Sequence, residues 1–116
     1  MDAAGGTGSR EAAQAAAAAG LDGLDPLLQH RSRLGALVLL SGVDAMTFTR
    51  LRELLNETDG NLGAQLKKLE EASYIHVNKA FQERRPVTWY SLTSAGRGAL
   101  KGQLAALEGL LRAAKV

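Results

Sequence analysis

The sequence predicts an α+β fold that is mainly helical. Three observations lead to this prediction: leucines recur at helical spacing in several segments, residues 74–92 contain two β-prone runs around a polar loop, and capping residues separate the segments. The expected order is helix, very short strand, helix, helix, strand, strand, helix. A chain of 116 residues fits one domain of this kind with a tail.

Composition excludes several classes of protein. The chain has no cysteine, which rules out disulfides, zinc-thiolate sites, cysteine nucleophiles and thiol sensors. Aromatic residues make up only 4%, so the core must be built mainly from leucine and alanine. No apolar run approaches the roughly 20 residues that cross a bilayer, and Asp2 and Glu11 stand where a signal peptide would be basic. We therefore expect a cytoplasmic protein with no membrane partner.

Residues 1–22 are expected to form a flexible or partly helical tail, and residues 23–116 the folded domain. The tail is rich in alanine and glycine, and a short helix of this kind is marginal by itself in water. It holds one basic and three acidic residues, so the rest of the chain keeps 13 of the 14 basic and 9 of the 12 acidic residues. The basic excess therefore belongs to the folded domain.

The first helix of this domain is expected from Asp25 to Ser41. Asp25 is a suitable N-cap and Pro26 suits the first helical position. Its apolar stripe consists of Leu27, Leu34, Leu37, Val38 and Leu40. A very short extended piece at 46–48 then precedes a second helix, for which Thr49 is the expected N-cap.

A third helix, about 58–72, follows the second after the single residue Glu57, so the two form a tight helix-turn-helix. Thr58 is its expected N-cap. The positions opposite or beside its leucine face are Asn61, Ala64, Gln65, Lys67 and Lys68. Asn and Gln amides can form two hydrogen bonds with an adenine edge, and lysine reaches guanine or phosphate. The same pattern fits an ordinary amphipathic helix with a solvated polar face, so this helix alone decides nothing.

Two β-prone runs, 74–81 and 87–92, flank the polar segment 83–86 and predict a hairpin. Its basic residues are Lys79, Arg84 and Arg85. Arginine pairs suit phosphate or minor-groove contact, although a charged loop also keeps a hairpin from self-association. Thr93 is the expected N-cap of the last helix.

The first and last helices contain more leucine than a domain of this size needs. In a monomer these faces would leave a large apolar patch in water, unless they all pack within one subunit. We therefore expect a dimer with two-fold symmetry. The expected interface residues are Leu27, Leu34, Leu100, Leu104, Leu107 and Leu111.

Two strings resemble a known family. Gly60 to Ala72 resembles the recognition-helix signature of winged-helix regulators, and Arg84 to Arg97 resembles their wing and the Thr-x-x-Gly-Arg start of the next helix. With 48–55 ahead of them, the likeness runs from about residue 25 to 112. It is greatest to the compact MarR/ArsR-like winged-helix DNA-binding domains of bacteria and archaea. It implies a winged helix-turn-helix with a two- to three-stranded wing sheet, whose first and last helices form the dimer interface.

The resemblance also implies a homodimeric transcriptional regulator that binds a pseudo-palindromic operator in double-stranded DNA. The helix at about 58–72 would enter the major groove, and the wing at about 79–88 would lie on flanking backbone or minor groove. The residues implied for DNA contact are Thr58, Asn61, Ala64, Gln65, Lys67, Lys68, Lys79, Arg84 and Arg85. Many relatives have histidine in place of Gln65 and glycine in place of Ser73. If the backbone at Ser73 is left-handed, serine costs about 1 kcal/mol.

No enzyme activity, cofactor or metal site is expected. His30 and His76 are far apart in sequence, and neither has an acidic partner at metal or triad spacing. A small-molecule effector is not identified by the sequence; Trp89, Tyr74 and Phe81 either line a pocket for one or pack in the core and hairpin. The alternative function is a winged helix used as a protein-interaction module without DNA binding. A bare, positive face on the third helix and the hairpin would separate the two functions.

Overall fold

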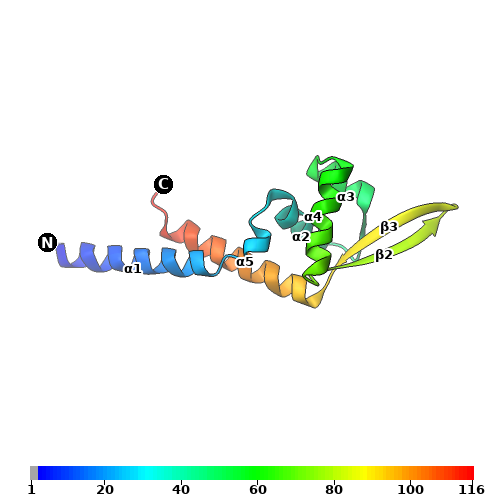
Figure 1. The fold of residues 1–116 in the computed structure, drawn as a ribbon. Coiled ribbons are helices and arrows are strands. Elements are labelled where there is room, and N and C mark those ends of the chain that lie inside the picture. The colour runs from blue at the N-terminus through cyan, green and yellow to red at the C-terminus, as the bar shows by residue number, and fades with distance from the viewer. Residues whose placement is uncertain (1–2) are drawn as a thin grey trace. The chain divides into compact units, whose positions relative to one another are not determined.

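A computed structural model describes residues 3–116, with side chains described from residue 8 onward (Figure 1). Its contacts divide the chain into two units. One is Pro26–Leu100, which contains the predicted helix-turn-helix and hairpin. The other joins the residues up to Asp25 with Lys101–Val116. Each unit is described by itself.

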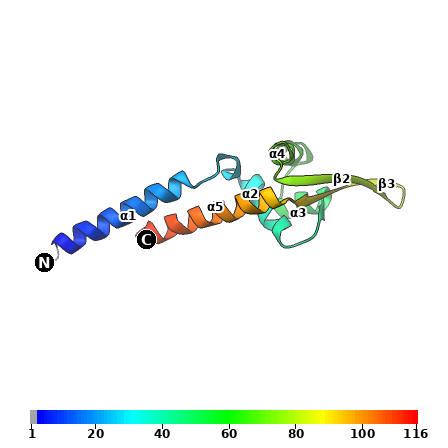
Figure 2. The same cartoon turned by 90° about the horizontal axis from the view of Figure 1, so that it is seen from below.

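The unit Pro26–Leu100 is mainly helical with one small sheet. Its elements are the 3-10 turn η1 (Pro26–Leu28), helix α2 (Arg31–Ser41), strand β1 (Met46–Thr47), helices α3 (Phe48–Leu55) and α4 (Asp59–Glu71), strands β2 (Ile75–Gln82) and β3 (Arg85–Leu92), and the first part of helix α5 (Ser94–Ala113). The sheet is antiparallel in the order β1-β3-β2. The β2–β3 hairpin projects beyond the helices α2, α3 and α4 (Figures 1 and 2). The predicted α+β class and order of elements are confirmed.

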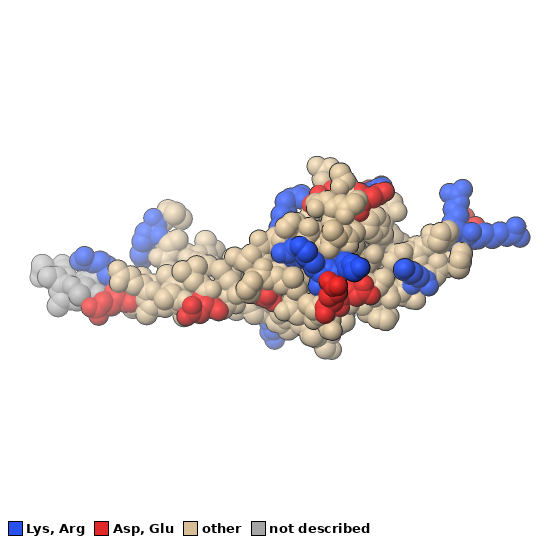
Figure 3. Space-filling model, in the orientation of Figure 1, with Lys and Arg blue, Asp and Glu red and all other residues tan. Residues whose placement is uncertain are grey.

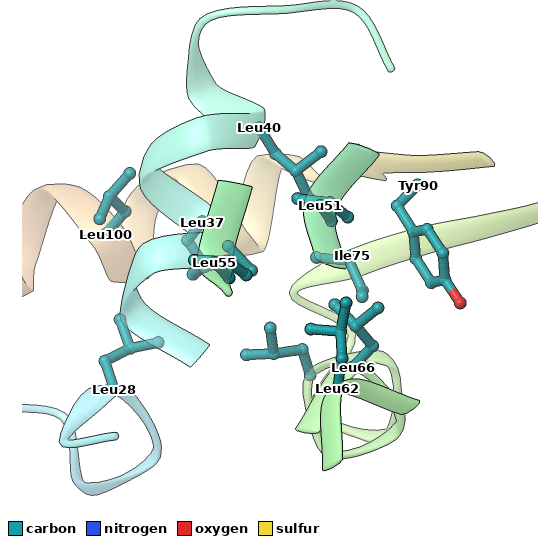
Figure 4. Packing of buried hydrophobic residues seen from close by; sticks show 12 residues of the cluster. Leu28, Leu37, Leu40, Leu51, Leu55, Leu62, Leu66, Ile75, Tyr90 and Leu100 are labelled. Atoms are coloured by element: carbon teal, nitrogen blue, oxygen red, sulfur yellow. The ribbon is translucent and has the colours of Figure 1, made fainter. Parts of the chain in front are cut away.

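Leucine builds the core of this unit, as the composition predicted. Side chains from α2, α3 and α4 meet those of the sheet and of α5 (Figure 4). The core residues are Leu28, Ala36, Leu37, Leu40, Leu51, Leu55, Leu62, Leu66, Leu69, Ile75, Tyr90 and Leu100. Each fully buried leucine stabilises the fold by about 1.5–3 kcal/mol relative to an exposed one. The leucine face predicted for the third helix therefore holds α4 against the rest of the unit.

The first predicted helix is broken in two. Pro26–Leu28 makes one short 3-10 turn, and His30 is then extended, with φ −124° and ψ 132°. The Nδ1 atom of His30 accepts a hydrogen bond from the Ser32 N–H at 3.1 Å. His30 rather than Asp25 is thus the N-cap of α2. Its imidazole nitrogen accepts the backbone hydrogen bond that a serine or aspartate oxygen usually accepts at this position.

Threonine caps three other helices, two of them at the predicted positions. Thr58 and Thr93 cap α4 and α5, since each Oγ1 accepts a hydrogen bond from the backbone N–H three residues on, at 3.2 and 2.9 Å. The prediction of Thr49 as the cap of α3 is wrong. Thr47 takes that role, with a corresponding distance of 3.1 Å, because it is the last extended residue of β1 and pairs with β3.

The loop of the hairpin is shorter than predicted. Only Glu83 and Arg84 form the turn, while Arg85 and Pro86 already belong to β3 and pair with the end of β2. Both turn residues have positive φ, 52° and 68°, as a two-residue hairpin turn matching the strand twist requires. Asn-Gly is the usual pair at such positions, and a residue with a Cβ costs about 1–2 kcal/mol there.

The other unit contains helix α1 (Ala3–Asp22) and the remaining part of α5. The segment for which a flexible or partly helical state was expected is therefore a helix. Small residues bring the two helices close: a Cβ added at Gly20 would lie 3.0 Å from Cγ of Leu110. Within this unit Gln103 is buried. The division into a tail, 1–22, and a folded domain, 23–116, stays a prediction.

Gly96 allows α5 to start directly against the chain between α4 and β2. A Cβ added there would lie 2.0 Å from the carbonyl oxygen of Tyr74 and 2.8 Å from Cδ1 of Leu92. The Thr93 N–H donates to the same Tyr74 carbonyl at 3.1 Å, and its hydroxyl donates to the Ser73 carbonyl at 2.6 Å. Ser73 has φ 64°, so its backbone is left-handed and serine costs about 1 kcal/mol there.

Replacing Gly96 by alanine should lower the free energy of unfolding by about 2 kcal/mol or more, because backbone rather than a movable side chain occupies the space. Gly98 is the matched control in the same helix, since an added Cβ there meets nothing within 4 Å. Gly98→Ala should instead raise stability by up to about 1 kcal/mol through helix propensity. Urea denaturation of both variants measures the two effects, and equal effects would contradict the close contact.

Candidate nucleic-acid interface

Helix α4 presents most of the predicted positions to solvent. Its leucines are buried on one side, and Thr58, Asn61, Ala64, Lys67 and Lys68 are exposed on the other. Gly60, two residues after the cap, has open space around it, which leaves the start of the helix slim. The first turn also carries the free N–H groups and the positive end of the helix dipole, which favour an anion such as phosphate.

An acidic residue in that first turn is neutralised within the protein. Asp59 would repel phosphate, but its Oδ1 accepts a hydrogen bond from Nη1 of Arg52 in α3 at 2.8 Å. This pair raises the pKa of Arg52 further above its usual value, mainly through the hydrogen bond. The Arg52 guanidinium thus offsets the negative charge of Asp59 at the start of α4. This is the end of the helix whose free N–H groups favour an anion.

Asn61 is held by hydrogen bonds on both ends of its amide. Its Nδ2 donates to Oε1 of Glu57 at 2.7 Å, and its Oδ1 accepts from Nε2 of Gln65 at 3.4 Å. Glu57 is anchored in turn by the hydroxyl of the buried Ser32, while Nη1 of Arg31 lies 3.6 Å from its Oε2. The exposed Asn61 side chain therefore has a fixed orientation on the helix surface.

Gln65 departs from the sequence prediction, which assigned it to the groove. Only 8% of it is exposed, and its Oε1 accepts a hydrogen bond from Nη1 of Arg33 at 2.5 Å. Arg33 also donates through Nε to the Leu27 carbonyl at 2.6 Å. Because Gln65 stands beside Leu66 and three residues after Leu62, its position on the helical wheel lies next to the apolar face. That spacing was the signal which could have identified it as a buried residue.

The sequence pointed to neither Glu57 nor Arg33 as part of this site. From the sequence, Glu57 is only the residue between two helices. The hydrogen bonds from Ser32 and Asn61 lower the pKa of its carboxyl, and the charge of Arg31 adds to them. The contacts of Glu57 with Ser32 and of Arg33 with Gln65 join residues 25 and 32 positions apart in sequence. A single helical wheel does not display such contacts.

The hairpin places its basic residues toward its far end. Arg84 lies in the turn, Arg85 directly follows it and Lys79 stands on β2, and all three are exposed. Figure 3 shows Lys and Arg side chains gathered at the end of the hairpin, with little acidic surface beside them. Phe81 is 79% exposed between them. The hairpin is thus a basic arm in the same unit as α4.

The three aromatic residues considered for an effector pocket are not brought together. Phe81 lies in the outer part of the hairpin, and Tyr74 packs against the leucine core. Trp89 lines a separate hollow on the sheet that includes neither of the other two. Of the two alternatives given by the sequence, one pocket lined by all three is not found in the described part of the chain.

The winged helix DNA-binding domain family matches residues 32–111, which cover α2 through nearly all of α5. The chain belongs to this family. An uncharacterized protein of Methanocaldococcus jannaschii is 40% identical over 72 residues, which are 62% of this chain and 78% of the relative. The predicted likeness to winged-helix proteins is therefore confirmed.

Solved structures extend the likeness to the family of MarR regulators. A transcriptional regulator homologue from Pyrococcus horikoshii matches 74% of this chain and 85% of its own with 26% identity and a TM-score of 0.69. ZitR of Lactococcus lactis, a zinc-responsive MarR family member, matches 70% of this chain at 28% identity and a TM-score of 0.55. This chain covers 55% of ZitR, a variant of which has been solved in complex with DNA. These relatives support a transcriptional regulator.

No three His, Asp or Glu side chains among residues 8–116 are grouped so that they could hold a metal ion. None of the helices described here is both long and apolar enough to span a bilayer.

Glu57 should make stability depend on pH in one direction. The pKa of Glu57 in the folded protein lies below its usual 4.5. The contribution of its carboxylate to the free energy of unfolding is therefore complete above pH 4.5 and is lost as the pH falls through the lowered pKa. From about pH 6 to pH 3, Glu57→Gln should therefore lose less unfolding free energy than wild type. Glu71→Gln removes an exposed carboxylate at the last residue of α4 and should follow the wild-type profile. Parallel losses in all three proteins, followed by chemical denaturation, would contradict this role.

Proposed function

We propose that the protein is a sequence-specific DNA-binding transcriptional regulator that acts as a homodimer. In this proposal α4 enters the major groove and the basic end of the hairpin contacts flanking backbone or minor groove. The observation that carries it is the exposed side of α4, on which Asn61 is held in one orientation, in the same unit as a hairpin with three exposed basic residues. Membership of the winged helix DNA-binding family supports the same assignment.

Asn61 is the residue to which we assign base recognition. An amide has two donor hydrogens and two acceptor lone pairs, and Glu57 and Gln65 occupy one of each. One donor and one acceptor remain, which is the pair that adenine requires at N7 and N6 in the major groove. Because the two neighbours fix which end of the amide is nitrogen, the side chain needs no reorientation to bind. We therefore assign to Glu57 and Gln65 the role of positioning Asn61. The base pair that Asn61 contacts is expected to be A·T.

The five basic residues among the predicted DNA contacts are assigned to phosphate groups. Lys67 and Lys68 lie on the exposed side of α4, and Lys79, Arg84 and Arg85 on the hairpin. Such contacts set the register of the protein on DNA and do not read sequence. The left-handed backbone at Arg84 costs free energy. In return, an arginine side chain extends from the turn at the tip of the hairpin.

Dimerisation is supported by the exposed leucines of α5. Leu104, Leu107 and Leu111 are 47, 37 and 70% exposed and follow one another at helical spacing, so they form one apolar stripe. By contrast, Leu100 is buried in the core of its own chain, and Leu27 and Leu34 pack against that core. Of the six predicted interface residues, we retain these three of α5 as the centre of the interface. A two-fold dimer would present two recognition helices to two half-sites.

Removal of the arginines at the tip should weaken binding to random duplex DNA and reduce its salt dependence. Each phosphate contact contributes about 0.9 to the slope of log affinity against log salt, so Arg84→Ala/Arg85→Ala should lower the slope by about 1–2. Lys101→Ala/Lys115→Ala removes the same charge from exposed positions of the other unit, and should leave the slope nearly unchanged. Equal slopes in the two variants, or no binding by wild type even at low salt, would favour the protein-interaction alternative.

Selection of an operator from random duplexes tests the role of Asn61. Asn61→Ala should lose the preference for A·T at one position in each half-site, where the discrimination lost is about 1–3 kcal/mol, or roughly 5- to 150-fold. A duplex with 7-deazaadenine at that position should weaken wild type and leave Asn61→Ala unaffected. Lys67→Ala is the control, because loss of a phosphate contact weakens all sequences alike. Uniform weakening by Asn61→Ala would contradict base recognition.

A further inference from the structure

We infer that a hollow on the outer face of the sheet is a binding site for a small organic cation, such as an amine or a quaternary ammonium compound. The hollow has a volume of about 450 Å³ and is formed by β2, β3 and the loop ahead of β1. This lies in the lower part of the range of about 300–1,000 Å³ that small-molecule sites occupy. All of its residues belong to the unit Pro26–Leu100.

The register of the sheet explains why its polar side chains converge. Trp89 on β3 is directly opposite Asn78 on β2, and Ser91 is opposite His76, so these four side chains share one face. Asp44 borders the same hollow from the loop ahead of β1. The residue between His76 and Asn78, Val77, turns to the leucine core on the other face.

These side chains are free for a ligand. Those of Asp44, His76, Asn78, Trp89 and Ser91 make no hydrogen bond or ion pair with any described residue. The network around Asn61, by contrast, links its members through hydrogen bonds to Ser32 and Arg33. The hollow therefore combines an aromatic ring with several unused donors and acceptors, a composition that small-molecule sites share.

The charge of the hollow selects the sign of the ligand. Asp44 is its one acidic residue, and no lysine or arginine lines it. The face of an indole carries negative electrostatic potential, so a cation within about 6 Å of the ring is attracted. Trp89 and Asp44 thus both favour a cation and both disfavour an anion, while Asn78 and Ser91 can hydrogen-bond its polar groups.

This site is separate from the residues assigned to DNA. Side chains alternate along β2, so Lys79 points to the face opposite that of Asn78 and Ala80. A ligand in the hollow leaves Asn61 and the arginines at the tip uncovered. The inference therefore does not depend on the proposed DNA binding and can fail or succeed independently of it.

Fluorescence of the 116-residue chain tests this site directly, because Trp89 is its only tryptophan. Titration with benzyltrimethylammonium chloride should produce a saturable change in emission. Phenylacetate, an anion of similar size, should produce no saturable change. A linear response to the cation, like that of free N-acetyltryptophanamide, would overturn the proposal.

Two exposed carboxylates provide a matched pair of variants. Asp44→Asn should raise the dissociation constant about three- to fivefold, in line with the loss of one solvent-exposed ion pair. Glu71→Gln removes an exposed carboxylate that does not line the hollow, and should bind as wild type does. Amide chemical shifts should move mainly at residues 44–45, 76–80 and 89–91. Equal affinity of both variants, or shifts centred elsewhere, would overturn the proposal even if the emission change saturates.

Discussion

The carbonyl group of Tyr74 is the point on which the arrangement of the DNA-binding unit depends. It accepts a hydrogen bond from Thr93 and leaves room only for glycine at residue 96. The Tyr74 N–H donates to the Leu69 carbonyl of α4 at 2.9 Å. One residue thereby fixes the end of α4, the first residue of the hairpin and the first turn of α5. The direction of the arm relative to α4 follows from this joint, and the left-handed Ser73 is the cost of making it in so few residues.

Local patterns predicted most of the elements because their determinants are adjacent in sequence. Thr58 and Thr93 were recognised as caps because each precedes a helix whose own N–H groups it binds. His30 was not, because imidazole is a rare cap, and the start of α3 was misplaced because pairing of β1 with β3 extends the chain as far as Thr47. Gln65 was misassigned for a further reason. Its place beside the leucine face was a local signal of burial, whereas its hydrogen bond with Arg33, 32 residues earlier, appears only once the helices are packed.

The unit uses polar side chains in two contrasting ways. Around Asn61 they are paired with one another, from Ser32 through Glu57 to Gln65 and Arg33. Pairing fixes geometry and lowers the entropy lost on binding. On the outer face of the sheet, Asp44 and Asn78 stand beside Trp89 without partners. A preset donor and acceptor suit a rigid base edge, whereas unpaired groups around an aromatic ring suit a small ligand that can adjust its own position.

The short reach of β1 has a consequence for motion. It pairs with β3 only at Trp89 and Tyr90, so beyond these two residues no third strand lies beside the hairpin. Isolated two-stranded hairpins are only marginally stable in water, and regions with few buried contacts open far below the free energy of global unfolding. We therefore expect this two-stranded part of the hairpin to open at a lower free energy than the leucine core of the unit. In the proposed complex with DNA, a duplex would restrict this motion, so the contacts assigned to Arg84 and Arg85 would include an entropic penalty that the prearranged Asn61 avoids.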